Sequence, residues 1–240
     1  MTTARTVGRA LTTVFTVVVS VAVAAILGDS AGGKILAALI IAAVIVAVEL
    51  LRNWATRRSR TARRLLRPPG SLYEGVWIQK VRAKGGSDVL SADEANSFSV
   101  IAIDFQDNGF HLNGRAYDSA GTEVAVFESD GNITVDDPRQ KSVYVWDGRL
   151  TAPELYNTPE SNRRGITEMT LRSSNSGDGQ VHHLGKGILM DFDITRVTTA
   201  YANTLNLKIS NESQLYDVDV QQDLAHKYAS VTIPHPAQLR

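Results

Sequence analysis

The sequence has no cysteine, which excludes a disulfide framework and any metal site built on thiolates. It also lacks the short motifs of common catalytic centres, namely a glycine-rich phosphate loop, HExxH and GxSxG. His182 and His183 are followed by Asp191 and Asp193, but the two histidines come directly after SNSGDGQ and are predicted to be a solvated pair in a loop. No catalytic constellation is found, so we expect no enzyme, no metal and no cofactor.

Acidic residues are missing from residues 52–70, RNWATRRSRTARRLLRPPG, which contain seven arginines. The formal net charge of the chain is zero, but this total hides a division. Residues 1–67 contain ten basic and two acidic residues, a charge of +8, whereas residues 68–240 contain fifteen basic and twenty-three acidic residues, a charge of −8. Such a division indicates two parts in different surroundings.

Charge is also absent from residues 10–27 and, up to Glu49, from residues 35–50. Each run approaches the length that a helix needs to cross a hydrocarbon core of about 30 Å, and residues 28–34, GDSAGGK, form a turn suited to a tight hairpin. A signal peptide would explain only the first run, and a buried soluble hairpin would show polar faces that both runs lack. We therefore predict a two-helix transmembrane hairpin over residues 10–51.

Basic residues near the helix ends predict the orientation of this hairpin. Arg5 and Arg9 precede the first helix and seven arginines follow the second, whereas the turn has only Lys34, offset by Asp29. Because cytoplasmic flanks carry the excess of basic residues, both termini, including residues 1–9, are expected in the cytoplasm. The arginine-rich segment is then a juxtamembrane linker that meets anionic lipid. In that position we do not expect it to bind DNA or RNA polymers.

The chain after Pro68 has a different texture, and we predict a cytosolic domain over residues 71–240. Short alternating runs are separated by turn signals such as DNG, DSAG and SDGN, with no helical run between them. This pattern indicates an antiparallel sandwich or a closed barrel, and we predict an all-β, roughly eight-stranded small barrel. The segment 211–229 fits a helix lying on the barrel. The predicted strands are residues 73–81, 97–105, 109–117, 122–129, 141–150, 165–173, 185–194 and 203–210.

Alternation along the predicted strands sorts the side chains into two faces. In the strand 109–117, Phe110 and Leu112 share one face, while Arg115 and Tyr117 share the other. In the strand 141–150, Tyr144 and Trp146 share one face. Aromatic rings, a guanidinium and amides on common faces indicate a polar, aromatic pocket.

The order of the parts, together with several short stretches, resembles a known class of membrane proteins. These stretches are YEGVW at 73–77, GRAYDSAG at 114–121, VYVW at 143–146 and GKGILMDF at 185–192. Over nearly its whole length the chain resembles the transmembrane β-barrel effectors of bacterial CBASS antiphage systems.

The resemblance implies that the barrel is a receptor for a cyclic dinucleotide made after phage infection. Ligand binding would drive oligomerisation of the transmembrane helices, disrupt the inner membrane and kill the infected cell. The resemblance also implies that the protein lies in the bacterial inner membrane and crosses it twice. The expected partners are the cyclic dinucleotide, the lipid bilayer and further copies of the chain.

The chemistry of such a ligand suggests which residues bind it. Bases stack on aromatic rings, phosphates pair with Arg or Lys, and a carboxylate accepts from a base edge. The predicted ligand-binding residues are the aromatics Trp77, Tyr117, Tyr144 and Trp146, the cations Arg115, Arg172 and Lys186, and the acid Asp191.

Two other functions are compatible with the same architecture. A membrane-anchored, lipocalin-like barrel would bind a lipid or another apolar molecule, and its interior would be dominated by Val, Leu, Ile and Phe without converging cations. A membrane-tethered scaffold would instead dock a partner protein on the acidic surface of the barrel.

Overall fold

The computed structural model describes residues 31–59, 62–63, 70–82, 97–106, 109–151, 162–184 and 188–232. The chain divides into two compact units, Met1–Leu72 and Tyr73–Arg240, and this division falls two residues after the predicted end of the basic linker.

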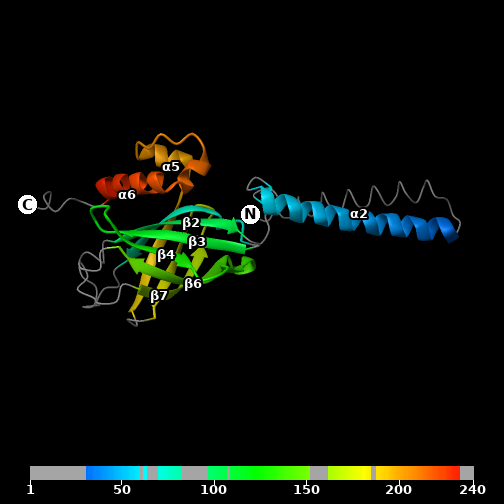
Figure 1. Ribbon diagram of the computed structural model, residues 1–240, viewed down its shortest axis with the longest axis horizontal. Helices are drawn as coiled ribbons and strands as arrows, with labels where there is room; N and C mark the ends of the chain where they lie inside the picture. The colour runs from blue at the N-terminus through cyan, green and yellow to red at the C-terminus, as the bar shows by residue number, and fades with distance from the viewer. Residues whose placement is uncertain are drawn as a thin grey trace, which may run out of the picture. The chain divides into compact units, whose positions relative to one another are not determined.

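Among the described residues of the first unit is one long helix, α2, which spans Ala31–Arg58 (Figure 1). At 1.5 Å per residue its 28 residues extend about 42 Å. Its window Ala38–Ala55 has a mean hydropathy of 1.9 and no buried share, and it is the one stretch of the described residues long and apolar enough to cross a membrane. The predicted first helix, residues 10–27, lies outside the described residues. The predicted turn 28–34 ends earlier than expected, because α2 already begins at Ala31.

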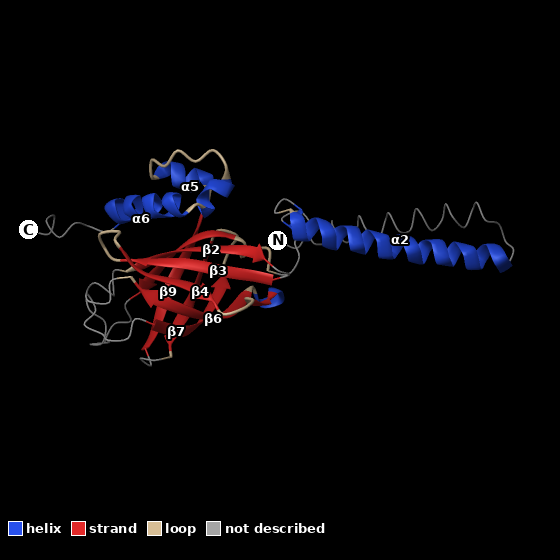
Figure 2. Ribbon diagram, viewed as in Figure 1, coloured by secondary structure: helices blue, strands red, loops and turns tan. Residues whose placement is uncertain are grey.

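The second unit is a closed barrel of eight antiparallel strands, as predicted (Figure 2). Successive strands pair with each other, and the ring closes through pairing of β4 with β6 and of β1 with β9. A short ninth strand, β5, pairs only with β6. The strands are β1 Gly75–Arg82, β2 Phe98–Gln106, β3 Gly109–Tyr117, β4 Glu123–Ser129, β5 Thr134–Asp136, β6 Lys141–Leu150, β7 Asn162–Leu171, β8 Ser176–His183 and β9 Ile188–Val197.

Two of the predicted segments differ from the structure in the type of element, and the strands predicted at 165–173 and 185–194 are shifted by up to three residues. The segment with SNSGDGQ and both histidines, predicted as a loop, is strand β8. Its glycines suggested a turn, but Gly179 lies where a Cβ atom would stand 2.5 Å from the ring of Phe192. Residues 203–210, predicted as a strand, instead contain the end of helix α5, Thr199–Thr204, which begins where the Thr198 side chain caps the Tyr201 amide.

Three short helices cover one side of the barrel (Figure 1). They are α5, the 3-10 helix η3 at Glu212–Tyr216 and α6 at Val218–Thr232, so the predicted helix near residues 211–229 is confirmed. Their apolar residues form one cluster with the outer faces of β1, β2, β3 and β9. The members include Val76, Ile78, Phe98, Val100, Tyr117, Val197, Leu215, Leu224 and Tyr228. Because Val76 and Ile78 face outward, the alternation of β1 turns Trp77 into the barrel.

One end of the barrel, which we call the Trp77 end, is where β1 begins and β9 finishes. Trp77 is fully buried, and its Nε1 donates a hydrogen bond of 2.8 Å to the carbonyl oxygen of Tyr73. The guanidinium of Arg196 lies 4.9 Å from the Trp77 ring centre and donates to the Glu74 carbonyl. A Cβ atom on Gly75, whose φ is +155°, would stand 2.8 Å from this guanidinium. These contacts tie the first strand to the last and fill this end.

The Trp77→Phe substitution is expected to lower the free energy of unfolding by about 2–4 kcal/mol. The Tyr73 carbonyl would lose its buried donor, and the Arg196 guanidinium would lose part of its ring partner. Urea unfolding of the detergent-purified chain, followed by circular dichroism, measures the change. Trp54→Phe is the control, because Trp54 is 57% exposed on α2. Indistinguishable curves for the two variants would contradict this role for Trp77.

Candidate functional site

The structure distributes the predicted ligand-binding residues over two faces of the barrel wall. Trp77, Tyr144 and Trp146 are buried on the inner side. The predicted cations and acid are not with them, because Arg115 and Asp191 occupy outward positions of their strands and Arg172 follows the end of β7, paired with Asp178. Tyr117 also faces outward, under the helices. Lys186 lies outside the described residues. The predicted set therefore does not form one pocket.

Opposite charges on the outer wall already pair with the predicted cations. Arg115 Nη1 lies 2.5 Å from Glu123 Oε2, and Arg172 Nε lies 2.9 Å from Asp178 Oδ1. Asp191 is similarly engaged, since its Oδ1 accepts a hydrogen bond of 3.0 Å from Gln180 Nε2. Alternation correctly placed Arg115 and Tyr117 on one face of the strand 109–117, but that face was predicted to line a pocket, whereas it belongs to the outer wall.

Tyr117 belongs to the hydrophobic core between barrel and helices. It is 1% exposed, and its ring stacks on Phe98 with centroids 5.5 Å apart and planes 19° from parallel. Its hydroxyl has no hydrogen-bond partner among the residues that the structure describes. Burial, with the nearby Glu123 carboxylate, raises the pKa of Tyr117 to about 12. The residue thus stabilises the helical layer and is not placed to meet a ligand.

Tyr117→Phe is expected to change stability at pH 7 by less than about 1 kcal/mol, because the lost hydroxyl has no partner. The raised pKa means that folding favours the neutral phenol. This contribution is fully present below about pH 10, where the unfolded chain titrates, and is lost as the pH rises towards 12. Denaturant midpoints between pH 8 and pH 12 should fall more steeply for the wild type than for the variant. Parallel curves would contradict the assignment.

The inner wall at the opposite end, where β8 finishes and β9 begins, contains an aromatic cluster. We call this the His183 end. The Trp146 ring lies 5.0 Å from the His183 ring in an edge-to-face contact and 5.7 Å from the Phe127 ring. Gly165 makes room for the indole, because a Cβ atom there would stand 2.5 Å from the Trp146 ring. A Cβ atom on Gly148 would likewise stand 3.0 Å from the Phe127 side chain.

A cation, Arg163, also faces inward at this end, two positions before Gly165 on the same face of β7. Residues that are direct cross-strand partners lie on the same face of a sheet. A continuous row of such partners links the inward-facing Trp77 to Arg163, so Arg163 also faces inward. Its neighbour Arg164 faces outward, with Nη2 2.6 Å from Asp130 Oδ2. Arg163 is partly exposed and has no acidic partner among the residues that the structure describes. The row runs through Trp77, Ile101, Gly114, Phe127, Gly148 and Arg163.

Polar groups also line the interior between the two ends. The hydroxyls of Tyr73 and Ser142 face each other, but neither completes a hydrogen bond of normal geometry. Burial raises the pKa of Tyr73 to about 12 and that of Tyr144 further, and the Thr167 hydroxyl partly offsets the second shift. Gln79 is 6% exposed on the inner face of β1. The interior therefore offers hydrogen-bonding groups as well as rings.

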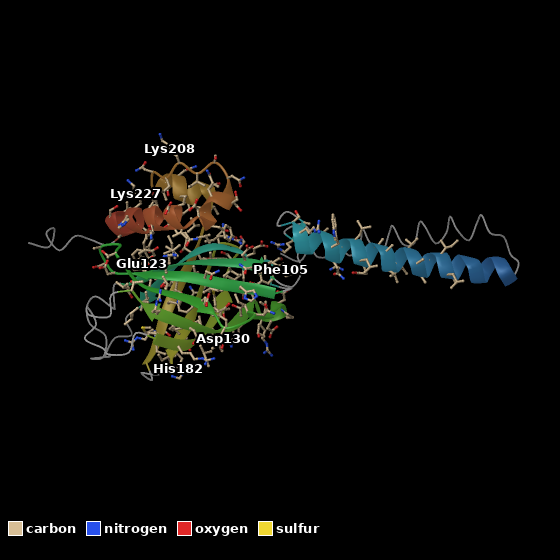
Figure 3. All side chains as sticks on the ribbon, viewed as in Figure 1. Phe105, Glu123, Asp130, His182, Lys208 and Lys227 are labelled. Atoms are coloured by element: carbon tan, nitrogen blue, oxygen red, sulfur yellow. The ribbon has the colours of Figure 1, made fainter. Side chains whose placement is uncertain are left out.

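The outer wall away from the helices carries the first histidine of the predicted pair. His182 lies on that side of the barrel (Figure 3), and His183, one residue on, points inward against Trp146. Within the described residues, no group of three or more His, Asp or Glu side chains could hold a metal ion.

Sequence reasoning missed Arg163, His183 and Arg196 as inward-facing residues. For Arg163 a signal was present, because it lies two positions before Gly165 and four before Thr167, and all three share one face of β7. The predicted strand began at residue 165 and so left it out.

Solved structures with a weak likeness to this chain include designed β-barrels. No family model and no curated protein matches the chain. Among solved structures, a redesigned β-barrel is 16% identical with a TM-score of 0.37, covering 53% of this chain and 94% of its own. A de novo designed fluorescence-activating β-barrel is 12% identical with a TM-score of 0.32, covering 52% and 93%. A redesigned barrel bound to DFHBI is also 12% identical, with a TM-score of 0.33, covering 52% and 95%.

Arg163→Ala is expected to weaken the binding of an aromatic anion at the His183 end at least about tenfold, the worth of a charge-assisted hydrogen bond. The probe is 8-anilinonaphthalene-1-sulfonate, whose fluorescence reports entry into an apolar site. Arg164→Ala is the matched control, since it removes the same charge from the next residue, which faces outward. Equal loss in both variants would show that only net charge matters and would contradict the inward site.

Proposed function

We propose that this protein is a membrane-anchored receptor whose barrel binds a cyclic dinucleotide at the His183 end. Binding drives association of the membrane helices, and the associated helices disrupt the inner membrane of an infected bacterium. The observation that carries the proposal is the inward-facing Arg163 on the same inner wall as the buried Trp146 and the partly exposed His183, in a closed barrel on the same chain as a long apolar helix.

The cluster has the groups that such a ligand requires. A base stacked on an aromatic ring gains about 1–3 kcal/mol, and Trp146 would supply that ring, with the base taking the place of His183 against it. A guanidinium binds phosphate oxygens in a bidentate way, which is the role of Arg163. Lys186, predicted to bind phosphate, follows strand β8 by three residues.

The membrane anchor of this proposal is α2 together with the predicted first helix, residues 10–27. The span Ala38–Ala55 is apolar and ends beside Trp54, a residue type that favours the interface. The Arg58 guanidinium lies 5.3 Å from the Trp54 ring centre. The two apolar runs predict a two-pass hairpin, and the distribution of arginines predicts that both of its termini are in the cytoplasm.

A lipid or other apolar ligand is the second candidate, and the composition of the inner wall favours it. Most of its fully buried side chains are apolar, and Arg115 and Arg172 point away from it. An apolar ligand would need no converging cations, and Arg163 would then meet a carboxylate head group. The buried apolar residues of the inner wall are Ile101, Ile103, Leu112, Met169, Phe192 and Ile194.

Titration of the full-length protein in detergent with a panel of cyclic dinucleotides is expected to show binding to at least one of them. Isothermal calorimetry measures it, and quenching of tryptophan fluorescence reports contact with Trp146. Trp146→Phe should lose most of the quenching, and Trp54→Phe should keep it. If no nucleotide of the panel gives a heat of binding or quenches the fluorescence, while a fatty acid binds tightly, the nucleotide proposal is overturned in favour of the apolar ligand. Release of the chain from membranes by alkaline carbonate would overturn the anchor.

A further inference from the structure

Helix α2 carries an ion pair inside its apolar span. Arg52 Nη1 lies 3.3 Å from Glu49 Oε1 and 3.5 Å from Oε2, one helical turn away. These two residues are the only charged ones between Ala38 and Ala55. Their side chains are far from buried, with 42% of Arg52 and 50% of Glu49 exposed.

In water this pair would contribute little to the stability of the helix, since an exposed ion pair contributes about 0–1 kcal/mol to the free energy of folding. Inside a bilayer the balance differs, because a charged side chain near the middle of a spanning helix costs about 2.5–3.5 kcal/mol. Glu49 lies six residues before the end of the span, or about 9 Å along the axis. Charges at that depth are favoured when further polar groups, or the interface, replace the lipid around them.

A second copy of the same helix has the matching groups. Copies inserted in one orientation place their α2 helices parallel, so that every Glu49 lies at one depth and every Arg52 about 4.5 Å further along the axis. Helices pack with axes about 8–10 Å apart, within reach of both long side chains. A two-fold axis parallel to the helices gives two contacts at once, from each Glu49 to the opposite Arg52.

We propose that Glu49 and Arg52 form an association site for a second copy of α2, in which ion pairs within one helix are exchanged for ion pairs between helices. The proposal rests on the membrane anchoring of the proposed function, but it requires neither the ligand nor the barrel. Charge complementarity selects the partner, because the site carries one acid and one base and is therefore complementary to itself.

The absence of cysteine allows a direct test by cross-linking. A single cysteine at Ile45 lies on the same face of α2 as Glu49 and Arg52, whereas one at Leu51 lies on the opposite face, by the 100° step of the helix. The full-length protein is reconstituted in vesicles of phosphatidylethanolamine and phosphatidylglycerol and oxidised. Ile45→Cys should give the covalent dimer in high yield, and Leu51→Cys, the matched control, should give little. Equal yields would overturn the proposed face.

Charge variants then separate pairing between copies from pairing within one helix. In the Ile45→Cys background, Glu49→Arg and Arg52→Glu each create like charges and should lower the dimer yield at least about fivefold, the factor that corresponds to 1 kcal/mol. Mixing the two variants, distinguished by tag size, should restore the yield in the mixed dimer alone. A pair acting only within its own helix would leave the mixture as poor as either variant, which would overturn the proposal.

The same samples distinguish this proposal from the proposed function. Cross-linking is measured with and without cyclic di-adenosine monophosphate and the other members of the nucleotide panel. Restoration in the mixture without any response to nucleotide supports the association site and counts against the nucleotide receptor. Uniformly low yields for Ile45→Cys and every charge variant, in chains that carbonate does not extract, would overturn the association site and leave the anchor intact.

Discussion

Closure of the barrel is the constraint on which the rest of the second unit depends. Pairing of β4 with β6 and of β1 with β9 leaves none of the eight strands with a free edge. A closed ring also fixes the parity of every residue, because a slip by one position in any strand would turn its whole inner set to the outside. Trp146 and Arg163 face inward, and Arg115 outward, for this single reason. The contact of Arg196 with Trp77 joins the first and last strands where the ring closes.

A barrel of eight strands has little interior volume, so large side chains fit only where a neighbouring inward position has no side chain. Three of the rings inside this barrel lie against glycines: Trp146 against Gly165, Phe192 against Gly179 and Phe127 against Gly114. In each pair an added Cβ atom would overlap the ring. The glycines therefore determine where the aromatic residues lie, and through them the position of the candidate site.

The same glycines explain which parts of the fold could be predicted. Strands such as β3 and β6 alternate cleanly, and their bounds agree with the prediction. Strand β8 has glycines at two of its inward positions, which leaves Val181 as the one apolar side chain on its inner face. The sequence of the segment therefore resembled a turn. A single sequence also does not say which face of a strand is inside. In β3 the outward Tyr117 is buried by α6, 100 residues later in the chain, and tertiary packing of that kind leaves no local pattern.

The charges follow the same division between wall and interior. The part after residue 67 carries −8, which would oppose the approach of an anionic ligand if all those charges acted at a distance. Several of the acids, however, are in ion pairs on the outer wall, among them Glu123 and Asp178. Exposed charges are screened over about 8 Å at physiological ionic strength. A partly enclosed guanidinium acts at contact distance and in a lower dielectric, where each interaction is several times stronger. For the proposed anionic ligand, the local field at Arg163 would therefore decide whether it binds, and the net charge of the domain would govern only how fast it arrives.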